Sequence, residues 1–199
     1  AFAMQDVLLE PYGGQVLGMN VGATTWLTAT LAAGGLTGFS IASVVLGRGM
    51  DPARMSLAGA VVGLPAFACV ILAAVVDSTA LFVLGALLIG LGGGIFGHGT
   101  LTLTMNRAPR EQAGLALGAW GAVQATAAGV AVALGGVLRD VAGALAADGA
   151  FGIGLAGPAT GYVVVYSLEI VLLAMTIIVM GTLVTAGREA STRPAALAR

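Results

Sequence analysis

The sequence predicts an all-α fold, a polytopic bundle of transmembrane helices. Of its 199 residues, 58% are hydrophobic and only 9% are charged, whereas a soluble domain carries about 25% charged residues. The apolar residues form five long stretches between positions 16 and 184, and about 20 such residues cross the hydrocarbon core of a bilayer. Glycine accounts for 32 residues, which in lipid favours close packing of helix backbones. The mean hydropathy of +1.02 agrees with a membrane location.

One partial and five complete spans are expected. In chain order they cover residues 1–12 (partial), 16–46, 56–76, 80–105, 112–138 and 159–184. Together they make a transmembrane half-bundle at 1–186, and a tail follows at 187–199. The first element resembles the end of an earlier span, so we expect the chain to be the C-terminal part of a longer protein. It is predicted to end at the helix-breaking run Pro11-Tyr12-Gly13-Gly14.

Short polar or proline-bearing segments mark the other boundaries. Asp51-Pro52 is a helix N-cap followed by proline at the first helical position. Asp77-Ser78 is expected to cap the next span in the same way. Pro158 precedes the last span, and Pro65 is expected to kink the span that contains it.

The distribution of arginine predicts the orientation. If the five spans alternate in direction, seven of the eight basic residues fall on one side of the membrane: Arg48, Arg54, Arg107, Arg110, Arg188, Arg193 and Arg199. The other side holds only Arg139, in a predicted loop at 139–157. Because cytoplasmic loops are enriched in basic residues, we expect the C-terminus to be cytoplasmic and the 139–157 loop periplasmic.

An internal repeat is visible at an offset of 96 residues. The pattern Gly18-x-x-x-Gly22-Ala23 returns as Gly114-x-x-x-Gly118-Ala119, and Ala29-Thr30-x-Ala32 returns as Ala125-Thr126-x-Ala128. The offset corresponds to three spans, so the two copies point in opposite directions across the membrane. Such a three-plus-three inverted repeat is typical of one half of a major facilitator fold.

No pattern in the sequence indicates catalysis. The chain has a single histidine and a single cysteine, and it lacks a nucleophile elbow, a phosphate-binding loop and metal-ligand spacing. It also lacks a basic cluster of the kind that binds nucleic acid. We therefore expect a protein that is not an enzyme and has no metal site formed by its own side chains.

His98 is the first candidate for a ligand contact. It lies among glycines, including Gly94 and Gly97, within the third complete span. A neutral imidazole in a dry site can be the axial ligand of a metal macrocycle, which the bare glycine surface would accommodate. Alternatively, the glycines form a close helix crossing and His98 donates a hydrogen bond to a neighbouring helix. Trp120 and Gln124, one turn apart, are candidates for contacts to the same ligand, although ordinary packing also explains the tryptophan.

Glu169 lies ten residues into the last span. An ionised carboxylate there costs about 2.5–3.5 kcal/mol on insertion scales, so it is either protonated or paired. Glu169 either binds a proton or a polar group of a ligand or partner helix, or it forms a structural hydrogen bond with serine or threonine on an adjacent helix.

Small residues form a stripe along one face of the 112–138 span. They are Gly114, Gly118, Ala122, Ala125, Gly129 and Ala133, at steps of three or four residues. Internal helix packing is the expected role of this stripe. The alternative is a groove that receives a helix of another protein, with Gly114 and Gly118 as partner contacts.

Two groups of charged residues lie near the predicted helix ends. Arg48, Asp51 and Arg54 resemble, loosely, the charged loop of major facilitator transporters, and a positive-inside anchor explains the arginines equally well. Asp6 and Glu10 would contact a cation of a partner or simply face solvent.

Three longer strings carry a family resemblance. They are AMQDVLLEPYGG at 3–14, FGHGTLT at 96–102 and GLALGAWGAVQAT at 114–126. With them the chain, up to about Val184, resembles the C-terminal half of the PucC/LhaA family, also called the bacteriochlorophyll delivery family. The resemblance implies a major facilitator-like protein in the inner or intracytoplasmic photosynthetic membrane of a phototrophic bacterium.

The same resemblance implies a role in assembling light-harvesting complexes. The expected partners are antenna polypeptides or a reaction centre–antenna complex, and the expected cofactor is transiently bound bacteriochlorophyll. Two other functions remain open: a proton-coupled transporter of a small solute with Glu169 as the titrating group, and a structural subunit that docks antenna helices without pigment.

Overall fold

The computed structural model describes residues 2–192, with side chains described for 2–152 and 154–185. These residues form six α-helices and three short 3-10 helices and contain no strand. The bounds are η1 Met4–Val7, α1 Leu9–Gln15, α2 Val21–Gly47, α3 Pro52–Val75, α4 Thr79–Arg107, η2 Arg110–Gln112, α5 Ala113–Ala147, η3 Ile153–Leu155 and α6 Ala159–Thr192. The predicted all-α fold class is confirmed, and α2 to α6 are long and apolar enough to cross a membrane.

The polar boundary residues cap helices as their sequence context predicts. The Asp51 carboxylate accepts a hydrogen bond from the Arg54 backbone N–H at 3.0 Å and begins α3. The Ser78 hydroxyl accepts one from the Leu81 N–H at 3.3 Å and begins α4. An unpredicted cap, Asn20, begins α2. Each cap satisfies a backbone donor that the first turn of a helix leaves without a partner.

Two local predictions differ from the observed helices: the chain break at residues 11–14 and the loop that was expected to start at residue 139. The Pro11-Tyr12-Gly13-Gly14 run does not break the chain, because α1 contains it and ends at Gln15. Pro11 is the third residue of this helix, where no intrahelical partner is needed for its missing N–H. The segment 139–147, predicted as loop, is the last part of α5. Helix α6 extends to Thr192 and so continues into the predicted tail, whose residues 193–199 lie outside the described residues.

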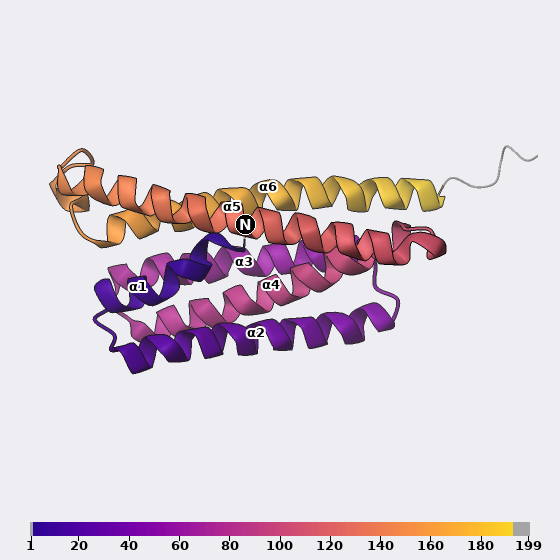
Figure 1. Ribbon diagram of the computed structural model, residues 1–199, viewed down its shortest axis with the longest axis horizontal. Helices are drawn as coiled ribbons and strands as arrows, with labels where there is room; N and C mark the ends of the chain where they lie inside the picture. The colour runs from indigo at the N-terminus through magenta and orange to yellow at the C-terminus, as the bar shows by residue number, and fades with distance from the viewer. Residues whose placement is uncertain (1, 193–199) are drawn as a thin grey trace, which may run out of the picture.

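Successive contacts join α2 to α4, α4 to α3, α3 to α6 and α6 to α5. The long helices run lengthwise beside one another (Figure 1). Helix α4 packs extensively against both α2 and α3, which hardly touch each other, and α6 joins α3 to α5. The segment η1–α1 starts near the middle of the bundle and packs against α5 and α2 (Figure 1). The α2–α3 junction, with Arg48 and Arg54, and the α4–α5 junction, with Arg107 and Arg110, lie at one end of the bundle (Figure 1).

A glycine seam joins α2 to α4. Its members are Gly34 and Gly38 on α2, and Gly90 and Gly94 on α4. A Cβ atom at any of them would lie 2.0–2.2 Å from a backbone oxygen of the other helix. Real Cβ atoms essentially never come that close. The two small-x-x-x-small pairs therefore allow backbone contact between the helices, which is how helices associate in lipid without a hydrophobic driving force.

The internal repeat corresponds only partly to the structure. Helices α2 and α5 run in opposite directions, as the repeat predicts (Figure 1). However, Gly18 lies in the turn before α2 with a φ of 62°, whereas its counterpart Gly114 is helical. The other matched positions are helical in both copies, so only the first glycine of the repeat differs in local structure.

Candidate functional site

A cavity of about 300 Å³ lies between α4, α5 and α6, and Phe2 and Ala3 form another part of its lining. Its lining is mainly apolar and consists of Phe2, Ala3, Gly93, Phe96, Gly97, Gln124, Ala127, Ala128, Ala131, Leu173 and Thr176. The Thr176 hydroxyl donates to the Leu172 carbonyl at 2.8 Å, so Gln124 supplies the more available polar group. The volume is at the lower limit for ligand pockets.

The structure does not bring the five pigment-contact candidates into one site. Gly97 and Gln124 line the cavity, but His98, Gly94 and Trp120 do not. The His98 ring packs edge-on against Phe39 of α2, with the ring centroids 4.1 Å apart. Gly94 lies in the glycine seam, where the Gly35 backbone covers it. A flat macrocycle thus has no bare surface at Gly94, and the arrangement does not fit the predicted axial-ligand site.

The alternative interpretation of His98 also lacks support. Its Nδ1 atom is buried and has no hydrogen-bond partner within the described part of the chain. The aromatic contact with Phe39, rather than a hydrogen bond between helices, is the observed interaction.

The small-residue stripe on α5 is exposed, which contradicts the expected internal packing. All six members, Gly114, Gly118, Ala122, Ala125, Gly129 and Ala133, are exposed, and a Cβ atom at any of the three glycines would meet nothing within 4 Å. Close helix crossings are made by other glycines, among them those of the glycine seam. Beside the stripe, an open apolar groove follows α5 from Ala122 to Leu134 and includes Met4 of η1. This face of α5 thus has the small residues of a helix interface without a covering helix among the described residues.

Glu169 is fully buried where η1 meets α6. Its Oε1 atom accepts a hydrogen bond from the Met4 backbone N–H at 3.1 Å, and its Oε2 atom has no partner among the described residues. Glu169 does not line the cavity. The carboxyl group holds the start of the described chain against α6, so its observed partner is a backbone amide and not a side chain of an adjacent helix.

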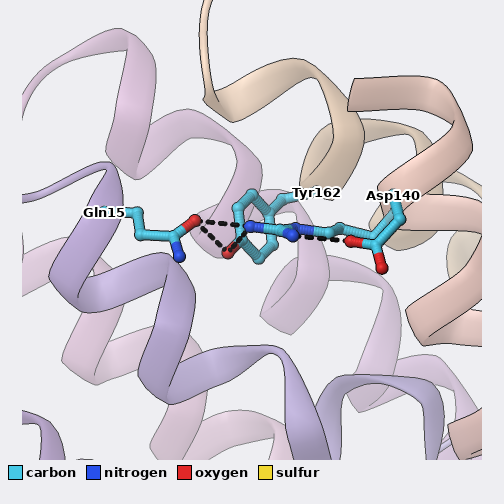
Figure 2. A network of polar contacts seen from close by, with 4 residues as sticks. Gln15, Asp140 and Tyr162 are labelled. Carbon is cyan, nitrogen blue, oxygen red and sulfur yellow. Dashed lines mark hydrogen bonds and ion pairs between the residues drawn. The ribbon is translucent and has the colours of Figure 1, made fainter. Parts of the chain in front are cut away.

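A polar network lies at the end of the bundle opposite to the α2–α3 and α4–α5 junctions (Figure 2). The sequence did not predict it. Arg139 of α5 donates to the Tyr162 hydroxyl of α6 at 2.7 Å and to the Gln15 side-chain oxygen of α1. The Tyr162 hydroxyl also donates to Gln15 at 2.8 Å, and Arg139 forms an ion pair with Asp140 at 2.6 Å. The Arg139 guanidinium carbon lies 4.6 Å from the Tyr162 ring centroid. The network joins α1 to the distant helices α5 and α6. In the sequence, only the position of Arg139 beside Asp140 could have indicated it.

The remaining acidic candidates each accept a hydrogen bond within the described part of the chain. Asp51 caps α3, and within the described side chains it forms no ion pair with Arg48 or Arg54. Asp6 and Glu10 are exposed. Asp6 accepts a hydrogen bond from the Gln5 amide at 3.0 Å, and Glu10 accepts one from the Thr28 hydroxyl at 2.6 Å. Trp26, the other tryptophan, is 74% exposed on α2.

The helices and their apolar outer faces define a multi-pass membrane protein. Comparison with known proteins gives the family. Residues 1–188 match the model of the family described as PUCC protein. The chain belongs to this family, and the resemblance seen in the sequence is confirmed.

Several relatives support the assignment. The chain is 56% identical over 179 residues to protein PucC of Cereibacter sphaeroides, covering 90% of this chain and 38% of the relative. It is 61% identical over 139 residues to protein PucC of Rhodovulum sulfidophilum, covering 70% and 31%. It is 50% identical over 196 residues to an uncharacterized protein of the puhA-bchM intergenic region of Rhodobacter capsulatus, covering 98% and 41%. The chain thus spans about two fifths or less of the length of these relatives. No solved structure matches it.

Proposed function

We propose that this chain is part of an assembly factor for light-harvesting complexes, and that the exposed α5 stripe receives a transmembrane helix of an antenna polypeptide. The observation that carries the proposal is the open small-residue face of α5 in a chain of the PUCC family. Small residues let a second helix approach closely in lipid. The family resemblance implies antenna polypeptides, alone or with a reaction centre, as the source of that helix.

In this proposal, bacteriochlorophyll binds transiently next to the docked helix. The cavity beside α5 has the volume for only part of a large amphipathic molecule. Its alanine-rich wall would hold an apolar portion, and the Gln124 amide would donate to a carbonyl group. The bound pigment would supply light absorption to the antenna. His98 has no part in this contact, because it faces Phe39.

The proposed orientation places the arginine-bearing loops and the C-terminus in the cytoplasm of a phototrophic bacterium, in its inner or intracytoplasmic membrane. The helix junctions with Arg48, Arg54, Arg107 and Arg110 share one end of the bundle, as the positive-inside rule requires for this orientation. The short segment between α5 and α6 would then face the periplasm.

The decisive experiment enlarges the stripe. We expect Gly118→Leu combined with Gly129→Leu to abolish co-purification of antenna polypeptides from photosynthetic membranes, because two bulky side chains would hold an incoming helix away. The matched control is Ala32→Leu on α2, which is also exposed and should leave co-purification unchanged. Antenna polypeptides that co-purify equally with both variants would refute docking at this stripe.

A second measurement tests the pigment contact. The absorption spectrum of the purified protein should show bacteriochlorophyll in the parent and in His98→Phe, but less of it in Gln124→Leu. A spectrum that loses the pigment only in His98→Phe would return the ligand role to the histidine.

A further inference from the structure

Three buried polar side chains lie on η1 and α6, which pack against each other, and each has an oxygen atom without a hydrogen-bond partner among the described residues. Tyr166 and Glu169 are fully buried, and Gln5 is 2% exposed. The unpartnered atoms are the Tyr166 hydroxyl, Glu169 Oε2 and Gln5 Oε1. Buried polar atoms are rarely left unpaired in proteins, and an enclosed water molecule is a common reason when several occur together.

The arrangement of the two backbones favours one shared site for these atoms. Tyr166 and Glu169 are three residues apart and so share one face of α6. The Met4 N–H donates to Glu169 Oε1 at 3.1 Å, which brings the adjacent Gln5 to the same face. The Gln5 amide nitrogen donates to the exposed Asp6 carboxylate at 3.0 Å, so the amide oxygen is left on the buried side.

Neighbouring groups cannot satisfy the three oxygens. The ring of Tyr12 packs edge-on against Tyr166 at 5.6 Å, but its hydroxyl donates to the Val70 carbonyl. Among the described side chains the ion pair that forms is that of Arg139 with Asp140, so Glu169 has no cationic partner there. An ionised carboxylate without a counter-charge in a membrane span is strongly disfavoured, whereas the neutral acid can donate a hydrogen bond.

We propose that Glu169, Tyr166 and Gln5 form a closed binding site for one water molecule and one proton, with Glu169 held as the neutral acid. The water accepts hydrogen bonds from the Glu169 Oε2–H and the Tyr166 O–H, and it donates one to Gln5 Oε1. All three oxygens are then paired, and the water has three polar partners, which is typical of buried water. The site fixes η1, and with it the Phe2 and Ala3 wall of the cavity, to α6.

Infrared difference spectroscopy of the protein in lipid nanodiscs at neutral pH tests the protonation state. We expect the carbonyl band of a protonated carboxylic acid in the parent. This band should disappear in Glu169→Gln and persist in Glu111→Gln, an exposed matched control. The proposal is overturned if the parent shows no acid band that depends on Glu169 and Glu169→Gln instead removes a carboxylate band.

The thermal midpoint of Tyr166→Phe tests the water and does not depend on the first variant folding. If the Tyr166 hydroxyl is bonded to an enclosed water, its removal lowers the midpoint. If it is unpaired, its removal from an apolar interior leaves the midpoint unchanged or raises it, and this result would refute the site.

Discussion

Adding one methyl group to the glycine seam should separate α2 from α4. In Gly90→Ala, the new Cβ atom would lie 2.0 Å from the Leu31 carbonyl oxygen, whereas an ordinary contact begins at 3.4 Å. The two backbones must therefore move apart by about 1.4 Å (3.4 minus 2.0) at this point. The obstacle is backbone and cannot rotate away, as a flexible side chain would.

The expected change in the free energy of unfolding of Gly90→Ala follows from two opposing effects. Overpacking in a well-packed interior costs about 1–3 kcal/mol, and backbone contact places Gly90→Ala near the upper end of that range. Replacing a helical glycine by alanine stabilises by about 0.5–1 kcal/mol. We therefore expect Gly90→Ala to lower the free energy of unfolding by about 2 kcal/mol.

Gly97→Ala on the same helix is the matched control. A Cβ atom there would meet nothing within 4 Å, so only the gain of about 0.5–1 kcal/mol in helix stability applies. Both variants are compared with the parent by unfolding in mixed detergent micelles, followed by circular dichroism. The reasoning fails if Gly90→Ala is as stable as Gly97→Ala.

Three further predictions concern polar contacts, each measured by the same unfolding assay. Arg139→Met should lose about 1–2 kcal/mol of unfolding free energy, because it removes charged hydrogen bonds that are partly solvent-screened. Tyr162→Phe should lose less. Equal stability of Arg139→Met and the parent would show that the network contributes nothing. Asp51→Ala should cost about 1 kcal/mol through loss of the α3 cap, while Asp51→Asn should be nearly neutral; a similar loss in both would point to charge rather than capping. Tyr12→Phe should cost about 1 kcal/mol, since the Tyr12 hydroxyl donates to the buried Val70 carbonyl at 2.9 Å; an unchanged stability would contradict this role.

The position of Glu169 illustrates how far the sequence reaches into the site. Its depth in the last span predicts that the carboxyl group is protonated or hydrogen-bonded, since lipid offers no water. The identity of its partner, the Met4 N–H, follows only from the packing of η1 on α6, which are separated by 165 positions. The same limit applies to Gln15, Arg139 and Tyr162, whose hydrogen bonds span 23 to 147 positions.

The sequence by itself determined the membrane environment, the five complete spans and the capping residues Asp51 and Ser78, because hydropathy and helix capping are local properties of the chain. Only the tertiary structure decided which glycines are covered. The seam at Gly34 and Gly90 and the open stripe at Gly118 have the same residue spacing, and they differ only in whether another helix lies against them. Likewise, the helices around α4 decide that His98 contacts Phe39 of α2 whereas the adjacent Gly97 lines the cavity. Packing between distant helices, which spacing along one helix does not encode, is the physical reason.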